Sequence, residues 1–230
     1  MLEIENLSFG WRPGQVLLDI PKMCLGQSER LFLRGPSGSG KSSLLGLIGG
    51  MLLPQRGSIR ILDTPIESLK GAARDRFRAD HIGLIFQQFN LLPYLDAVDN
   101  VLLALEFSPR RRARLGTVSA RAEALSLLQR LHLDASSLDG RAAAQLSVGQ
   151  QQRVAAARAL IGAPELVIAD EPTSALDQDT RENFLALLFD ECQRAGAALL
   201  FVSHDRSLEA RFDRSVDLRA LNRADAVAAC

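Results

Sequence analysis

The chain has 230 residues, of which 47% are hydrophobic and 23% are charged; this composition is typical of a globular protein and excludes a disordered or fibrous one. Lysine and arginine together number 27, as do aspartate and glutamate, so the formal net charge is zero, and a protein that binds nucleic acid mainly by neutralising phosphates is disfavoured. A chain of this length buries a full core, so we expect one large domain, or one domain with an inserted lobe.

The cysteines and the apolar stretches limit the function further. Cys24, Cys192 and Cys230 are widely spaced and form no C-x-x-C pair or cluster with histidine, so they predict neither a disulfide framework nor a zinc site. The longest apolar stretches, such as residues 197–202, are far shorter than the roughly 18 residues that a membrane-spanning helix requires. Met1 is followed by no basic and apolar leader, so no export signal is expected.

Strand and helix patterns alternate along the chain. Alternating apolar and polar residues predict half-exposed antiparallel strands at residues 2–9 and 58–61. Continuous apolar runs are typical of parallel strands covered by helices on both faces, and they occur at residues 31–33, 166–169 and 199–202. Helical periodicity is found in residues 41–48, 119–131, 150–160 and 181–194. This order predicts an α/β fold that binds ligands beyond the carboxyl ends of its strands. Residues 91–160 have helical periodicity without a buried strand, so we interpret them as an inserted helical lobe.

A glycine-rich loop lies between the first apolar run and the first helix. The pattern G-x-x-x-x-G-K-[ST] is matched there by Gly35, Pro36, Ser37, Gly38, Ser39, Gly40, Lys41 and Ser42. Its glycines let successive backbone amides face one anion, and the helix that follows adds the positive end of its dipole. Lys41 is expected to neutralise the β and γ phosphates of a nucleotide, and the Ser42 hydroxyl to bind Mg²⁺. The predicted nucleotide site also includes the next residue, Ser43.

Two carboxylates follow the apolar run at residues 166–169. Asp170 and Glu171 would be costly to bury unless they meet a cation or water at the end of the strand. Because successive side chains of a strand point in opposite directions, we expect Asp170 to bind the magnesium ion and Glu171 to activate the attacking water. Pro172 disfavours a helical backbone at Glu171, so an extended conformation is expected there.

Further segments resemble motifs of one family, the ABC ATPases. Leu146-Ser147-Val148-Gly149-Gln150 resembles the signature L-S-G-G-Q of that family. Four further positions resemble motifs of the same family. They are Ser174-Ala175-Leu176-Asp177 (the D-loop), His204 (the switch histidine), Gln87 (the Q-loop glutamine) and Trp11 (the aromatic residue that stacks on adenine). The resemblance extends over nearly the whole chain in the family's order. The segment Phe89-Asn90-Leu91-Leu92-Pro93 is most similar to the branch that serves macrolide export and lipoprotein release.

The resemblance implies the fold and the division of the chain. It implies a P-loop NTPase with a RecA-like core, an N-terminal antiparallel β subdomain and an inserted α-helical subdomain. Residues 1–230 would form a single ABC ATPase domain. Within it, residues 1–90 and 161–230 would form the β subdomain and the nucleotide-binding core, and residues 91–160 the helical signature subdomain.

The resemblance also implies a site shared by two copies of the chain. Ser147 and the Gly149 amide of one copy would contact the γ-phosphate held by the other copy, and Gln150 and Asp177 would also belong to the nucleotide site. Gln87 and His204 would act in catalysis beside Glu171, with Gln87 also near the metal. Two alternatives stay open at this point: Gln88 in place of Gln87, and a packing role for Trp11. Val148 stands where the family usually has glycine, and because a β-branched residue tolerates positive φ poorly, we expect an ordinary backbone conformation there.

The implied function is that of an ATP-hydrolysing subunit that requires ATP and Mg²⁺. It would act as a homodimer on integral membrane permease subunits, on the cytoplasmic face of the cell membrane, and would drive export or extraction of a substrate; no nucleic acid and no zinc are expected. An alternative is an ATP-dependent signalling module that acts on a membrane partner without transport. A P-loop kinase is a weaker interpretation, because a kinase does not need the segment from Leu146 to Gln150.

Overall fold

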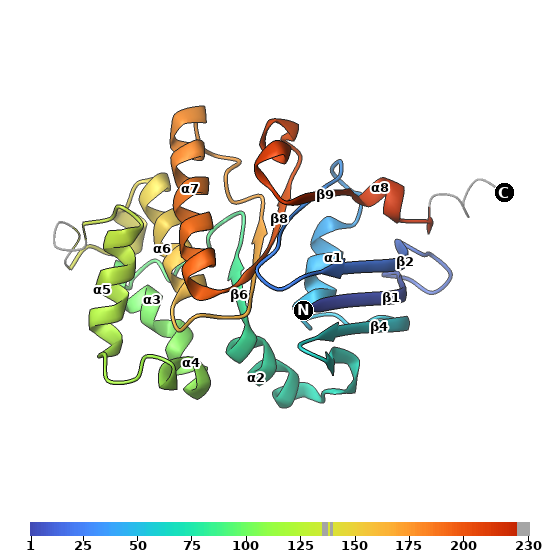
Figure 1. The fold of residues 1–230 in the computed structure, drawn as a ribbon, viewed down its shortest axis with the longest axis horizontal. Coiled ribbons are helices and arrows are strands. Elements are labelled where there is room, and N and C mark those ends of the chain that lie inside the picture. Colours follow the sequence, from blue (N-terminus) through green and yellow to red (C-terminus); the bar gives the residue numbers. More distant parts are fainter. Residues whose placement is uncertain (135–137, 139, 225–230) are drawn as a thin grey trace. The chain divides into compact units, whose positions relative to one another are not determined.

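The chain is divided between two units in the computed structural model, which describes residues 1–134, 138 and 140–224. One unit comprises residues 1–78 and the segment from Ala198 onward, and the other comprises residues 79–197 (Figure 1). Of the three cysteines, Cys24 is exposed and Cys192 is buried, and Cys230 lies outside the described residues. No helix among the described residues has the length and apolar character needed to cross a membrane.

The first unit contains two sets of strands. Its elements are β1 (Leu2–Phe9), β2 (Leu18–Leu25), β3 (Arg30–Arg34), α1 (Lys41–Ile48), β4 (Arg56–Ile61), β5 (Thr64–Pro65), a 3₁₀ turn (Ile66–Ser68), β8 (Ala198–Ser203), a 3₁₀ turn (Arg206–Arg211), β9 (Arg214–Asp217) and α8 (Leu218–Leu221). Helix α2 (Gly71–His81) begins in this unit and ends in the second one.

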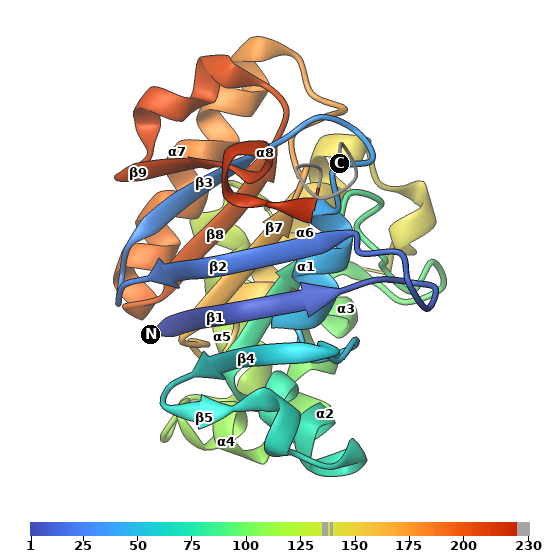
Figure 2. The same ribbon diagram turned by 90° about the vertical axis from the view of Figure 1, so that its right-hand side faces the viewer.

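Strands β2, β1, β4 and β5 lie side by side in that order in an antiparallel sheet (Figure 2). Ile4 of β1 pairs with Met23 on one side and with Ile59 on the other. The alternation in β1 places Leu2, Ile4 and Leu7 in the core with no exposed area, because successive side chains of a strand face opposite sides. The predicted half-exposed strands at residues 2–9 and 58–61 are therefore confirmed.

Strand β3 lies between β8 and β9, and both pairings are parallel. Its apolar run is fully buried, and the ring of Phe32 stacks on Phe201 of β8 with centroids 6.2 Å apart. Phe212 lies 5.1 Å from each of these rings. This aromatic cluster fixes β3, and hence the position from which the glycine-rich loop leaves the sheet.

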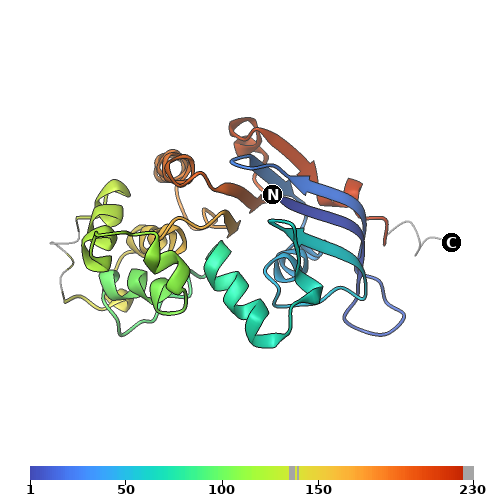
Figure 3. The same cartoon turned by 60° about the horizontal axis from the view of Figure 1, so that its bottom comes forward.

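The second unit is mainly helical (Figures 1 and 3). Its elements after α2 are β6 (Ile82–Ile85), α3 (Ala97–Glu106), α4 (Pro109–Ala113), α5 (Ala120–Arg130), a 3₁₀ turn (Ala143–Gln145), α6 (Val148–Leu160), β7 (Leu166–Asp170) and α7 (Gln178–Ala195). The described residues between 91 and 160 form helices and connections and no strand. The helices expected at residues 119–131, 150–160 and 181–194 are confirmed.

Helix α6 packs closely against β6, which pairs in parallel with β7. A side chain at Gly83 of β6 would place its Cβ 2.3 Å from the carbonyl oxygen of Ala159. Only glycine permits this approach, since a Cβ would collide with the helix backbone. The contact brings the C-terminal half of α6 next to the strand that leads into Gln87.

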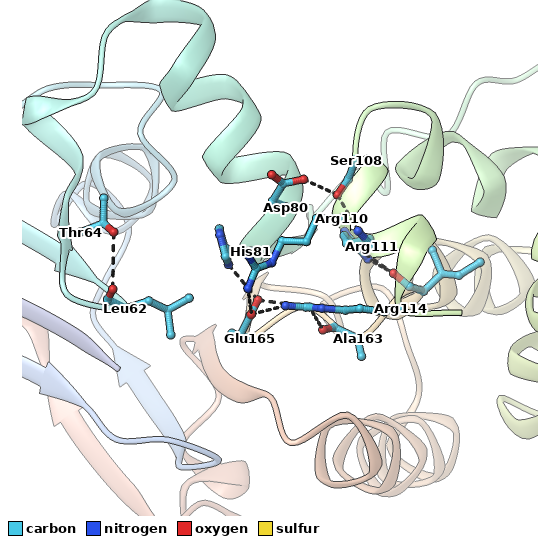
Figure 4. Close-up of polar contacts among 11 residues, drawn as sticks. Leu62, Thr64, Asp80, His81, Ser108, Arg110, Arg111, Arg114, Ala163 and Glu165 are labelled. Carbon is cyan, nitrogen blue, oxygen red and sulfur yellow. Dashed lines mark hydrogen bonds and ion pairs between the residues drawn. The ribbon is translucent and has the colours of Figure 1, made fainter. Parts of the chain in front are cut away.

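An ion-pair cluster joins α2 and α4 to the residue before β7 (Figure 4). Glu165 Oε2 lies 3.0 Å from Nδ1 of His81, and the same carboxylate is paired with Arg114. Arg110 lies 3.7 Å away. Burial raises the pKa of Glu165, but the hydrogen bonds from His81 and Arg114 and their charges outweigh it and lower the pKa to about 2.

This cluster predicts a pH-dependent loss of stability. Because the pKa of Glu165 is lowered in the folded chain, its contribution is complete above the unfolded pKa of 4.5 and is lost as the pH falls toward about 2. After a discount for partial exposure, we expect Glu165→Gln to lower the free energy of unfolding by about 2 kcal/mol at pH 7. Urea unfolding should show this difference shrinking by roughly half or more at pH 3.

The matched control for this experiment is Glu106→Gln. Glu106 is exposed and pairs with Arg112 at the surface, and exposed ion pairs contribute at most about 1 kcal/mol. A Glu165→Gln effect that is equally large at both pH values would contradict the assignment.

Candidate functional site

The glycine-rich loop begins where β3 ends at Arg34 and closes where α1 begins at Lys41. Gly40 is the N-cap of α1 with φ of +92°, and it supplies no side-chain cap. Gly38 also has a positive φ, of +79°. The loop therefore has glycine where the backbone is left-handed, and the helix begins without a side-chain acceptor at its N-cap.

Lys41 and Ser39 show that this loop fits a phosphate group. The Lys41 side chain is 7% exposed, and its ammonium donates hydrogen bonds to the carbonyls of Gly35 at 2.7 Å and Pro36 at 3.0 Å. The Ser39 hydroxyl oxygen is buried and has no hydrogen-bond partner among the described residues. A Cβ at Gly35 would lie 2.7 Å from that oxygen. Because a buried polar atom is costly without a partner, an anion held by Lys41 and Ser39 suits this arrangement.

The two carboxylates at the end of β7 differ in backbone conformation. Asp170 is the last residue of β7, whereas Glu171 lies outside the strand with φ of +44°. The expectation of an extended backbone at Glu171 is wrong, because the chain turns there and the Glu171 carbonyl accepts a hydrogen bond from the amide of Ser174 at 3.3 Å. A left-handed glutamate is strained, and such strain is concentrated at functional sites.

Gln152 holds this turn, and it is not among the residues predicted from the sequence. Its side chain is 1% exposed and donates a hydrogen bond of 2.7 Å to the carbonyl of Pro172, next to Glu171. It lies on α6, two residues after the signature segment. Burial of a glutamine side chain is costly unless the side chain is hydrogen-bonded. The partner of Gln152 lies 20 residues away in the sequence, so no local pattern identifies this residue.

The signature segment forms the start of α6. Ser147 is the N-cap, and a capping box joins it to Gln150: its hydroxyl accepts from the Gln150 amide at 3.3 Å, and its own amide donates to the Gln150 side chain at 2.9 Å. Val148 is the first helical residue and has no positive φ, as expected. A Cβ at Gly149 would meet nothing within 4 Å, so open space adjoins this end of the helix.

Gln87 and Gln88 occupy the centre of a tight turn. The turn is closed by a hydrogen bond of 2.9 Å from the Phe89 amide to the Phe86 carbonyl, and both glutamines are exposed. Phe89 and Asn90 follow with φ of +58° and +49°, which is an unusual conformation for a bulky residue such as phenylalanine. Gln87 remains the candidate.

The remaining predicted residues lie at element ends. Trp11 is 66% exposed, and its ring meets Phe9 edge-on with centroids 5.3 Å apart. His204 directly follows β8 and is exposed. Asp177 caps α7, where hydrogen bonds from the backbone and hydroxyl of Thr180 lower the pKa of its carboxyl.

The candidate residues are divided between the two units. The first unit holds Trp11, residues 35–43 and His204, and the second holds Gln87, residues 147–150, Asp170, Glu171 and Asp177. The Ser42 hydroxyl, the carboxylate of Asp170 and the amide oxygen of Gln87 are the groups that the sequence predicts as magnesium ligands. Oxygen ligands of this kind are those that Mg²⁺ prefers.

Comparison with known proteins decides the family. The model of the family described as ABC transporter matches residues 18–174. The chain belongs to this family. Membership confirms the predicted α/β P-loop NTPase fold and the predicted Mg²⁺-dependent ATPase activity of an ABC cassette.

Relatives of this ABC cassette support the predicted branch. The lipoprotein-releasing system ATP-binding protein LolD of Syntrophotalea carbinolica is 38% identical over 95% of the chain and 94% of its own length. The uncharacterized ABC transporter ATP-binding protein YbbA of Escherichia coli is 39% identical over the same shares. The chain is an ATP-binding subunit of the LolD and YbbA type.

Solved structures agree with this assignment. The dimeric structure of MJ0796, a bacterial ABC transporter cassette, has a TM-score of 0.83 and 34% identity and covers 94% of each chain. A dimeric post-hydrolysis state of the same cassette, bound to ADP and Pi, has a TM-score of 0.84 and 34% identity over 97% of this chain and 95% of that one.

Proposed function

We propose that this subunit works as a homodimer and couples ATP hydrolysis to a separate integral membrane permease. The coupled process is export of a substrate or its extraction from the membrane. The observation that carries the nucleotide chemistry is the geometry of the glycine-rich loop. The Lys41 ammonium donates a hydrogen bond to the Gly35 carbonyl, and the buried Ser39 hydroxyl, which has no partner among the described residues, lies beside Gly35. The direction of transport is supported by the similarity to LolD, a protein of a lipoprotein-releasing system.

The predicted site residues have distinct roles in this proposal. The amides of residues 35–43 and the Lys41 ammonium bind the phosphates. Bound magnesium would neutralise charge on the phosphates, and Ser42, Asp170 and Gln87 would hold it. Glu171 accepts a proton from the attacking water, His204 contacts the γ-phosphate, and Trp11 stacks on adenine.

The dimer places the signature of one copy on the nucleotide of the other. Ser147 lies at the N-terminus of α6, whose dipole favours an anion. Gly149 adjoins open space, which permits close approach of a phosphate. Asp177 would contact the same nucleotide, and the dimeric relative MJ0796 supports such an assembly.

The test is co-purification with a membrane protein encoded beside this chain, followed by reconstitution of both in vesicles. We expect a complex of two copies of the chain with the membrane subunits, on the cytoplasmic face, and ATP-dependent movement of cargo. If the chain is always isolated without a membrane partner, the proposed coupling to a permease is contradicted. A complex that hydrolyses ATP without cargo movement would favour signalling through the membrane partner.

A further inference from the structure

We propose that Arg158 is a positioning residue that ties the signature helix to the turn carrying Gln87. Helix α6 begins at the signature segment and carries Arg158 near its other end. The inference rests on the proposed role of Gln87 in ATP hydrolysis. It adds a physical connection between that residue and the helix that carries Ser147.

The connection consists of two short hydrogen bonds. The two terminal nitrogens of the Arg158 guanidinium donate to the carbonyl oxygens of Asn90 and Phe89, each at 2.6 Å. The planar guanidinium suits this geometry because it presents several donors in a fixed arrangement. Both acceptors belong to residues with positive φ, so the bonds are made to the strained part of the loop.

The contact between Arg158 and Phe89 is partly buried. Phe89 is 8% exposed, and burial lowers the pKa of the Arg158 guanidinium below its ordinary value. Among the described residues, both hydrogen bonds of this side chain go to carbonyl groups. Hydrogen bonds from a charged donor are stronger than those between neutral groups, so Arg158 holds the left-handed residues in place.

The far end of the same loop is fixed by other groups. Asn100 has no exposed area, and its side chain bonds to the amide and carbonyl of Leu92 and to the carbonyls of Leu95 and Asp96. The amide of Ala143 donates to the Leu95 carbonyl at 2.8 Å. The loop end remote from Gln87 therefore stays anchored when Arg158 is removed.

Loss of Arg158 should consequently affect the turn between Phe86 and Phe89 and leave the glycine-rich loop intact. Gln87 would sample several positions, and misplacement of a catalytic group by about 1 Å can lower a rate by roughly a hundredfold. Nucleotide affinity depends mainly on residues 35–43 of the first unit. The expected signature is a lower kcat with little change in KM for ATP.

The experiment is a double-mutant cycle on the ATPase activity of the full chain, with Arg158→Met and Gln87→Ala. We expect Arg158→Met to lower kcat about tenfold with KM for ATP changed by less than about twofold. In the Gln87→Ala background the same substitution should lower kcat by less than about twofold, because the group that Arg158 positions is absent. Arg158→Lys should restore part of the lost kcat, since an ammonium retains the charge but lacks the planar pair of donors.

The matched control is Arg153→Met. Arg153 lies on the same helix and donates a hydrogen bond of 3.0 Å to the carbonyl of His132, which also has a positive φ, but His132 follows α5 and not β6. This variant should retain the kcat of the original chain.

Three outcomes would overturn the proposal: an unchanged kcat in Arg158→Met, independent effects that multiply in the double variant, or an equal loss in Arg153→Met. If Arg158→Met does not fold, as judged by its thermal unfolding, Arg158→Lys replaces it in the same cycle. Failure of the underlying function gives a different result, because the original chain would then hydrolyse no ATP or Gln87→Ala would leave kcat unchanged.

Discussion

Replacement of Glu171 by glutamine is expected to abolish ATP turnover while ATP binding is retained. Glutamine has nearly the same shape as glutamate but cannot accept the proton of the attacking water, and general-base catalysis contributes roughly a hundredfold or more to a rate. The phosphate-binding groups around Lys41 are unchanged by the substitution. The variant should therefore accumulate as an ATP-bound dimer.

The measurement combines phosphate release with size-exclusion chromatography in the presence of ATP and Mg²⁺. Glu182→Gln is the matched control, because Glu182 is an exposed carboxylate on α7 and has no proposed role in hydrolysis. Undiminished phosphate release by Glu171→Gln would remove Glu171 from its proposed role.

Ser147→Arg is expected to lower turnover far more than Val148→Gly. The arginine places a long side chain where the phosphate of the partner's nucleotide would approach, and loss of a preorganised donor to a reacting phosphate costs roughly a hundredfold in rate. Val148 is 49% exposed and already helical, so glycine there mainly destabilises the first turn, by less than about 1 kcal/mol. We expect Val148→Gly to change kcat by less than about threefold.

Ser119→Arg separates this effect from the loss of a helix cap. Ser119 is the N-cap of α5, where its side chain accepts a hydrogen bond from the amide of Ala122 at 3.2 Å. Its replacement therefore removes a similar cap and lowers the free energy of unfolding by about 1 kcal/mol. Phosphate release and thermal unfolding should be measured for all three variants. A larger loss of turnover in Val148→Gly than in Ser147→Arg would mean that the phosphate contact has been assigned to the wrong residue.

The sequence predicted the elements whose causes are local. The alternation in residues 2–9 predicts β1, because one face of an antiparallel strand is buried and the other is solvated. The apolar run at residues 31–33 and the glycines that follow it predict a buried strand and a phosphate loop, because backbone shape at these glycines is a property of the residues themselves. The N-terminal turn of α6 follows similarly from Ser147 and Gln150.

Only the tertiary structure decided which distant polar groups meet. Arg158 is 68 residues from the carbonyl of Asn90, and His81 is 84 residues from Glu165. The left-handed backbone of Glu171 follows from the turn after β7, where the buried Gln152 from α6 holds the neighbouring Pro172 carbonyl. A pattern of hydrophobic residues or glycines predicts the conformation of its own segment. The partner of a buried polar group depends instead on how the rest of the chain packs around it. For this reason the backbone shape of the glycine-rich loop was predictable from its own residues, and the partners of Arg158, His81 and Gln152 were not.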